Sequence, residues 1–206
     1  ILQLKGNSIM VMVGRKFPEV STPAVLTNGE IVDQFNVHDY AEKSHTVVFF
    51  YPLDFTFVCP TEIVTFNHMM SEFEKRNVKV IAASVDSAHC HAAWRRTEIN
   101  DGGIGEVNFP MIADIKRELS SELGILAEAG VTYRASYLLD AEGIVRHMVV
   151  NDFPLGRNVE EMIRMVDALQ FTEQHGEVCP ANWKQGQKGM EANRESTAAY
   201  LKDTAA

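Results

Sequence analysis

The chain has 206 residues and a net charge of −9, and 46% of its residues are hydrophobic. This length and composition are typical of one globular domain with a possible appended segment. The acidic balance disfavours a nucleic-acid-binding protein, which needs a basic surface, and weakly disfavours binding to anionic membranes. No apolar run approaches the roughly 20 residues that span a bilayer. Three cysteines do not indicate a disulfide scaffold, and their odd number favours a reducing compartment, so we expect a cytoplasmic protein.

The first residues are expected to contribute nothing to function. ILQLKGNSIMVMVG lacks the apolar core and the small-residue cleavage site of a signal peptide, and Met10 and Met12 are candidate native starts. We therefore expect residues 1–13 to be an N-terminal extension or an expression remnant. The main domain is predicted over residues 14–170, and a C-terminal arm over residues 171–206.

The first half of the domain predicts alternating strands and helices. The β-rich apolar run HTVVFFY (45–51) stops at Pro52 and predicts a buried strand. Apolar residues at helical spacing predict a helix over 61–76. VKVIAASVD (78–86) predicts a second buried strand, and a helix is expected around His89–Glu98.

The second half predicts one more strand, a hairpin and two helices. FPMIAD leads into a short helix that Asp114 is expected to cap and Gly124 to end. Two strands, 137–140 and 144–149, flank the turn sequence AEG, and Asn158 is the expected N-cap of the last long helix. The order predicts an α/β sandwich in which parallel strands lead into an antiparallel hairpin. The arm is turn-rich and ends in a short helical segment.

The stretch PLDFTFVCP, between the first buried strand and its helix, carries the most chemical information. Pro60 suits the first position of a helix, so Cys59 is expected at the helix N-terminus. Unpaired N–H groups and the helix dipole favour an anion there, and therefore a thiolate. The hydroxyl of Thr56 is a candidate to donate to the sulfur or to a bound peroxide.

Here the chain resembles a known family. Pro52, Thr56 and Cys59 match the peroxiredoxin active-site motif P-x-x-x-T-x-x-C, and Cys179 in EVCP matches the resolving-cysteine motif of the typical 2-Cys group. SVDS, Trp94, GGIG, FPMIAD and NDFPLGRN add corroborating matches, so the resemblance covers roughly residues 14–206. The likeness is greatest to the bacterial alkyl hydroperoxide reductase C proteins of this group.

The resemblance implies a thioredoxin-like α/β fold and a thiol peroxidase that reduces hydrogen peroxide and alkyl hydroperoxides. In such enzymes Cys59 would become a sulfenic acid, which Cys179 of a second protomer resolves as a disulfide. The resemblance also assigns catalytic support to Arg134, and to Glu62 the task of holding an arginine. From the residues alone, pairing within one chain and pairing between two chains both remain open.

The resemblance further implies a homodimer that assembles into a decamer. It implies no metal, haem or flavin, because the thiol itself is the redox centre. Thioredoxin, or a dedicated flavoprotein or AhpD-like reductase, would supply the electrons.

Several other residues are expected to be structural. Cys90 is expected to be incidental, and a zinc site is disfavoured because His89 and His91, two apart on a helix, point to different faces. Trp94 is expected in the core or in a contact between protomers. The same is expected of four phenylalanines, of which the last two remain candidates to line an apolar entrance for organic hydroperoxides: Phe49, Phe50, Phe55 and Phe57.

Two alternative functions compete with a peroxidase. A thioredoxin-like disulfide exchanger requires C-x-x-C, which the chain lacks. A holdase-type binding protein is the other alternative. In the family, sensitivity to over-oxidation accompanies a GGLG-type loop and a C-terminal Tyr-Phe pair. This chain has GGIG but ends Tyr200-Leu201, so we expect intermediate sensitivity.

Overall fold

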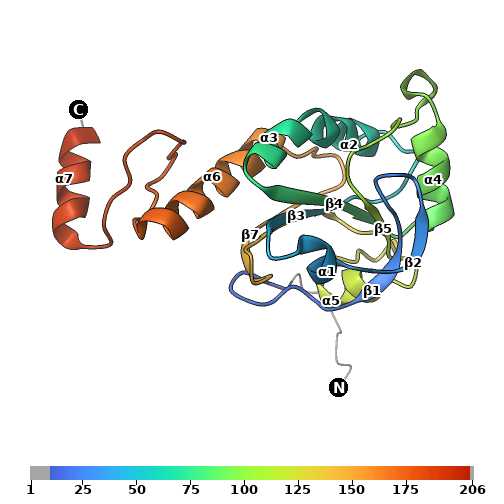
Figure 1. Cartoon of the computed structure of the whole chain (residues 1–206), viewed down its shortest axis with the longest axis horizontal. Coiled ribbons are helices and arrows are strands. Elements are labelled where there is room, and N and C mark those ends of the chain that lie inside the picture. Colours follow the sequence, from blue (N-terminus) through green and yellow to red (C-terminus); the bar gives the residue numbers. More distant parts are fainter. Residues whose placement is uncertain (1–9, 205–206) are drawn as a thin grey trace. The chain divides into compact units, whose positions relative to one another are not determined.

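The computed structural model describes residues 10–204, so residues 1–9 of the predicted extension lie outside the described part. The chain divides between Val159 and Glu160 into two compact units. The first unit is built on a seven-stranded sheet with the order β2-β1-β5-β4-β3-β6-β7 (Figure 1).

The helices and strands of the first unit have the following bounds. The strands are β1 (Ser21–Val25), β2 (Ile31–Asn36), β3 (His45–Phe50), β4 (Val78–Ser84), β5 (Met111–Ala113), β6 (Arg134–Leu139) and β7 (Val145–Asn151). The helices are α1 (Val37–Ala41), α2 (Cys59–His68), α3 (Met70–Lys75), α4 (Ala88–Arg96), the 3-10 helix η1 (Ile99–Asp101) and α5 (Glu118–Glu122).

The centre of the sheet is the predicted mixed arrangement. β3 pairs in parallel with β4, and β4 pairs in parallel with β5. On its other side β3 pairs antiparallel with β6, which forms the predicted antiparallel hairpin with β7. Gly143 provides the expected positive φ, 78°, in the hairpin turn. The predicted thioredoxin-like α/β fold is confirmed.

Alternating side chains of β3 supply both cores of the sheet. Val48 and Phe50 belong to a buried apolar cluster that also contains Leu119 and Leu123, at the α5 side. Phe49 points to the opposite face, where its ring stacks on Phe66 of α2 at 4.1 Å between centroids. Because β3 is buried on both faces, its sequence is a continuous apolar run. The strand ends at Phe50, and the active-site loop that begins at Pro52 follows it closely.

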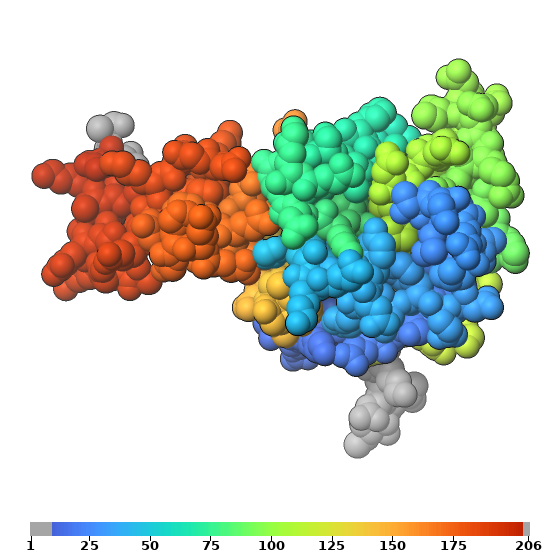
Figure 2. Space-filling view, in the orientation of Figure 1, coloured from blue at the N-terminus to red at the C-terminus, as the bar shows by residue number. Residues whose placement is uncertain are grey.

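Four elements, β1, β2, α1 and the 3-10 helix η1, were not predicted from the sequence, and two helices were predicted as one. β2 is an edge strand whose central residues Asp33 and Gln34 are exposed, so it lacks a strong apolar pattern, and it lies on the surface, blue in Figure 2. The predicted helix 61–76 is interrupted at Met69, which has φ −95° and ψ 6°. Apolar spacing continues across this break, so the pattern did not reveal it.

Asp114 acts on α5 as expected, although not from the N-cap position itself. Its carboxylate accepts hydrogen bonds from the backbone N–H groups of Leu119 and Ser120, at 3.1 and 2.8 Å. Gly124 follows the helix with a φ of 67°. A left-handed glycine after the last turn ends a helix at low conformational cost.

The second unit contains α6 (Val159–His175) except for its first residue, and the whole of α7 (Arg194–Thr204). Between them, Val178 and Met190 form an isolated antiparallel bridge that closes a loop. The predicted boundary at 170/171 falls inside α6 and stays a prediction. None of the helices in residues 10–204 has the length and apolar character needed to cross a membrane.

Candidate active site

Cys59 is the first residue of α2, with Pro60 in the first turn, as the sequence predicted. The N-cap residue, Val58, offers no side-chain hydrogen bond to the helix end. The first-turn N–H groups therefore remain available to an anion, and the positive end of the helix dipole points the same way. The side chain is almost inaccessible, since Cys59 is only 1% exposed.

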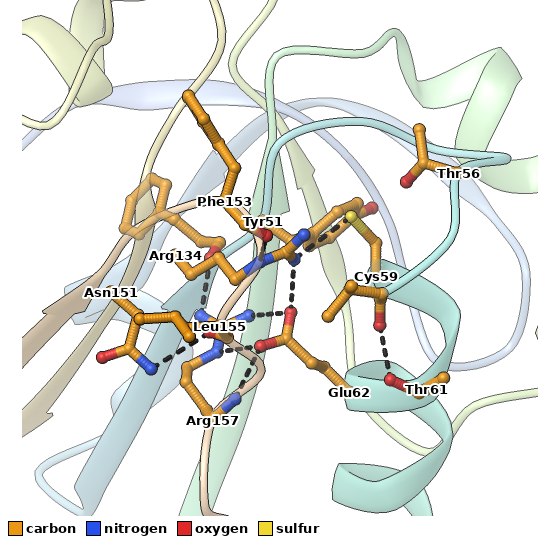
Figure 3. Close-up of polar contacts among 12 residues, drawn as sticks. Tyr51, Thr56, Cys59, Thr61, Glu62, Arg134, Asn151, Phe153, Leu155 and Arg157 are labelled. Atoms are coloured by element: carbon orange, nitrogen blue, oxygen red, sulfur yellow. Dashed lines mark hydrogen bonds and ion pairs between the residues drawn. The ribbon is translucent and has the colours of Figure 1, made fainter.

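A buried arginine contacts the sulfur. Arg134, the first residue of β6, donates from Nη1 to Sγ of Cys59 at 3.3 Å and to Oε2 of Glu62 at 2.8 Å (Figure 3). Its Nε donates to the carbonyl of Phe153 at 2.7 Å. These three contacts leave the guanidinium little freedom, so a fixed cation lies beside the sulfur.

A second buried arginine, Arg157, completes the cluster. It donates from its backbone N–H and from Nε to Oε1 of Glu62, and from Nη2 to Oε2 at 2.7 Å. Burial lowers the pKa of Arg157 from its ordinary value, and the charge of Glu62 opposes that effect. Two cations and one carboxylate carry a net charge of +1 in a buried site. A thiolate at Cys59 would bring this formal sum to zero.

The sulfur opens onto a shallow apolar pocket of about 390 Å³. Pro52, Thr56, Phe57 and Phe153 line this pocket together with Cys59 and Arg134. Phe57 is 92% exposed, whereas Phe49, Phe50 and Trp94 are buried in the core. The placement of Phe57 favours the alternative of an apolar entrance.

The hydroxyl of Thr56 does not contact the sulfur in this structure. It donates to the carbonyl of Leu53 at 2.8 Å, and Figure 3 shows it on the loop above Cys59. With its hydrogen used, the hydroxyl can only accept, so it is suited to receive the O–H of a hydroperoxide. The expectation that Thr56 donates to the sulfur is therefore not met in this conformation.

The loop that carries Thr56 is anchored to α4 and to the end of β4. The backbone N–H of Asp54 donates to Oδ2 of Asp86 at 2.9 Å, and the Asp54 carboxylate contacts Nδ1 of His91 at 2.8 Å. Phe55 has a left-handed φ of 52°, and its ring packs on Trp94 at 5.6 Å. A bulky residue in this conformation is strained, and surrounding contacts must hold it there.

His91 is not available as a metal ligand. Its Nδ1 faces Asp54, and its Nε2 lies 3.1 Å from the carbonyl of Ile112. His89 is exposed while His91 is buried, so the two do point to different faces.

One group of candidate metal ligands occurs among residues 10–204: donor atoms of Asp54, Asp86 and Cys90 lie within 4.8 Å of one another. Hydrogen bonds from Ser84, Tyr51 and backbone already engage the two carboxylates. Burial and the two acidic neighbours raise the pKa of the Cys90 thiol to about 12. A protonated thiol is a poor metal ligand, so the group is better explained as a hydrogen-bonded anchor of the loop.

Cys179 lies in the second unit, where its sulfur contacts α6. It is half-buried, 3.6 Å from the carbonyl of Ala168 and 3.8 Å from the hydroxyl of Thr172. Of the sequence-predicted residues, the first unit thus brings together Pro52, Thr56, Cys59, Glu62 and Arg134.

Comparison with known proteins identifies the family. Residues 13–148 match the model of the AhpC/TSA family, and residues 168–203 match the C-terminal domain of 1-Cys peroxiredoxin. Alkyl hydroperoxide reductase C of Buchnera aphidicola (strain APS) is 50% identical over 193 residues, which cover 93% of this chain and 98% of the relative. The chain belongs to the AhpC/TSA family. The Helicobacter pylori (strain 26695) alkyl hydroperoxide reductase C is 46% identical over 94% of this chain and 98% of its own.

Solved structures of AhpC/TSA-type proteins agree with this assignment. The reduced 2-Cys peroxiredoxin of Plasmodium vivax has a TM-score of 0.90 at 38% identity, covering 94% of this chain and all of that one. Enterococcus faecalis AhpC has a TM-score of 0.76 at 35% identity, covering 83% of this chain and all of its own. The resemblance to the typical 2-Cys peroxiredoxins is confirmed.

In this AhpC/TSA protein one residue of the charged cluster, Arg157, was not predicted from the sequence. Glu62 was expected to hold an arginine that the sequence did not identify, and the structure shows that it holds two. The motif NDFPLGRN, which contains Arg157, entered the sequence analysis only as a corroborating match. That motif was the available signal for Arg157.

Proposed function

We propose that Cys59 is the peroxidatic cysteine of this enzyme. Family and relatives make the chain a thiol peroxidase that reduces peroxides. The hydrogen bond from Arg134 to the Cys59 sulfur, at a helix N-terminus, is the observation that supports the assignment most strongly. The sulfur attacks one oxygen of the peroxide, the O–O bond breaks, and the other oxygen leaves as hydroxide or alkoxide.

Arg134 and Thr56 are proposed to act on the peroxide itself. Arg134 can donate to the oxygen that gains negative charge, because its guanidinium lines the pocket next to the sulfur. Thr56 accepts the O–H of the hydroperoxide and thereby orients it. Pro52 walls the pocket and shields the sulfur from water. Glu62 holds the guanidinium groups of Arg134 and Arg157 in place.

The second half of the reaction is proposed for Cys179. Its sulfur would attack the Cys59 sulfenic acid of a partner protomer, forming an S–S bond and releasing water. Thioredoxin or a dedicated reductase would then return two electrons. We further propose a homodimer that assembles into a decamer in the cytoplasm, with preference among hydrogen peroxide and alkyl hydroperoxides set by the apolar pocket. Residues 14–170 would form the peroxidase domain and residues 171–206 the arm.

One experiment tests the assignment of both cysteines. The reduced protein receives one equivalent of hydrogen peroxide, free thiols are blocked, and the products are separated on non-reducing gels. Wild type and Cys90→Ser should give a disulfide-linked dimer, and Cys179→Ser and Cys59→Ser should give none. Peroxide consumption should be lost only in Cys59→Ser during a single turnover. A Cys59→Ser protein that still consumes peroxide would overturn the assignment.

A further inference from the structure

Two contacts on α6 hold the sulfur of the half-buried Cys179 in this structure. A carbonyl can only accept, so the thiol donates to Ala168 at 3.6 Å, and the Thr172 hydroxyl, 3.8 Å away, is then the donor to sulfur. Both partners belong to α6 of the same chain. The sulfur therefore has to leave these two partners before it can reach a sulfenic acid elsewhere.

A second attachment holds the same segment on the same face of α6. Arg164 donates from Nη1 to the backbone carbonyl of Trp183 at 2.9 Å. Arg164, Ala168 and Thr172 are spaced by four residues, so they follow one stripe of the helix. The segment from Cys179 to Trp183 thus lies along that stripe and is attached at both of its ends.

The Arg164 end of this attachment is built firmly. Glu161 accepts from Nε and Nη2 of Arg164, at 2.6 and 2.8 Å, and raises the pKa of the guanidinium. Trp183 is buried, its ring packs on Phe171 at 4.8 Å, and its Nε1 donates to the carbonyl of Gln187 at 3.1 Å. A bidentate carboxylate pair fixes the direction of the remaining Arg164 donor.

We propose that Arg164 is a positioning residue that controls the release of the resolving cysteine. While Arg164 holds the Trp183 carbonyl, Cys179 stays docked on Ala168 and Thr172. Opening this contact frees the segment and lets Cys179 reach the oxidised Cys59 of a partner protomer. The proposal rests on the proposed function of Cys179 and adds the contact that sets the rate of its second step.

The consequence is a competition for the sulfenic acid. In resolution, the Cys179 sulfur forms a bond to Cys59, the S–O bond breaks, and the departing hydroxide leaves as water with the thiol proton. In over-oxidation, a second peroxide transfers an oxygen to the same sulfur and gives a sulfinic acid. A faster release of Cys179 therefore lowers the sulfinic fraction at a given peroxide excess.

Arg164→Met removes the contact and keeps the aliphatic part of the side chain. A hydrogen bond from a charged group stabilises the docked segment more than a neutral one does. We therefore expect Arg164→Met to form the disulfide about tenfold faster and to give a lower sulfinic fraction. Arg194→Met is the matched control, because Arg194 is an exposed arginine at the start of α7 in the same unit. Thr172→Val, which removes the hydroxyl contact to the Cys179 sulfur, is expected to act in the same direction.

Rapid-quench mass spectrometry measures the rate of disulfide formation and the sulfinic fraction, and stopped flow measures the first reaction with peroxide. In Arg164→Met the first rate should equal that of wild type. A disulfide rate that is unchanged or slower, with an unchanged first rate, overturns the proposal. Thr172→Val should have the unfolding temperature of wild type and still form the disulfide faster. This result would separate release of Cys179 from a general loss of stability. If Cys179→Ser still forms the disulfide dimer, the proposed function has failed instead.

Discussion

Arg134 donates a hydrogen bond to the sulfur of Cys59 over 3.3 Å, from the same nitrogen that donates to Glu62. The cation is therefore shared between an attacking atom and a structural carboxylate. Thiolate formation alone gives a modest gain, because the nucleophilicity of a thiolate falls as the acidity of its thiol rises. A fast peroxidase must also stabilise the leaving oxygen, and Arg134 is placed to do both.

Replacing Arg134 tests this double role. We expect Arg134→Ala to lower the peroxide rate constant by about 10²–10³, because one donor to the developing charge is lost. The loss should exceed the change in thiolate fraction, which ultraviolet titration of the thiolate measures in parallel with stopped-flow kinetics. Arg146→Ala, an arginine paired with Asp140 at the sheet edge, is the control. Rates that follow thiolate fraction alone would contradict the double role.

The charge balance of the buried cluster predicts a stability effect. Glu62→Gln leaves Arg134 and Arg157 without a carboxylate, which costs about 3–5 kcal/mol in the free energy of unfolding. Chemical denaturation measures this loss of unfolding free energy, and Glu160→Gln, at an exposed position, is the control. If the Cys59 thiolate carries the fourth charge, adding Cys59→Ser should increase the loss more than additively. A cost below about 1 kcal/mol would show that the cluster is solvated.

Cys90 should be unreactive in the folded protein. Burial is the first cause that raises its pKa to about 12, so at pH 8 roughly one thiol in 10⁴ is ionised. Because the shift is upward, reactivity appears only as the pH rises toward that value. Iodoacetamide labelling of Cys59→Ser, followed by peptide mapping, should show slow labelling of Cys90 that speeds up in urea. Rapid labelling at pH 8 without urea would refute it.

Phe57 should select among peroxides without stabilising the fold. Its ring is 92% exposed at the pocket rim, so Phe57→Ala should change the unfolding free energy by less than about 0.5 kcal/mol. A partial ring contact worth about 1 kcal/mol predicts a roughly fivefold lower kcat/KM for cumene hydroperoxide. The value for hydrogen peroxide should stay unchanged. Phe57→Leu should restore most of the difference, and equal losses for both substrates would exclude selection by the ring.

The C-terminal helix offers a test of over-oxidation. Leu201 in α7 is exposed. The Tyr-Phe pair that accompanies sensitivity to over-oxidation in the family has a phenylalanine at this place. We expect Leu201→Phe to raise the sulfinic fraction at a fixed peroxide excess. The phenylalanine ring is larger than the leucine side chain and would bury more apolar surface, so it would hold the arm more firmly. Mass spectrometry after repeated turnover measures it, with Leu201→Met as control. An equal fraction in wild type and variant would show that position 201 has no influence.

The catalytic loop and the central strands could be predicted because their sequence signals are local. HTVVFFY marks a buried strand, and Pro60 marks the helix start at Cys59. β2 could not be predicted, since an edge strand with exposed Asp33 and Gln34 has little apolar periodicity. Propensity is a weak guide where pairing with a neighbouring strand, here β1, defines the element.

The charged cluster was only partly predictable for a different reason. Glu62 and Arg134 are 72 positions apart, and Glu62 and Arg157 are 95 apart, so no spacing argument links them. The family motif supplied Arg134. The bond between Thr56 and Leu53 is local but depends on the rotamer of one hydroxyl, which the residue type does not specify.

The left-handed backbone of Phe55 restricts which residues evolution can place there. Glycine or asparagine would fit φ 52° at lower conformational cost, but either would lose the ring contact with Trp94. Valine and isoleucine would lose the ring contact as well, and branching at Cβ would raise the conformational cost of this φ further. A library of all substitutions at position 55 should therefore retain activity mainly with aromatic residues, although the backbone there is one that aromatic residues rarely adopt.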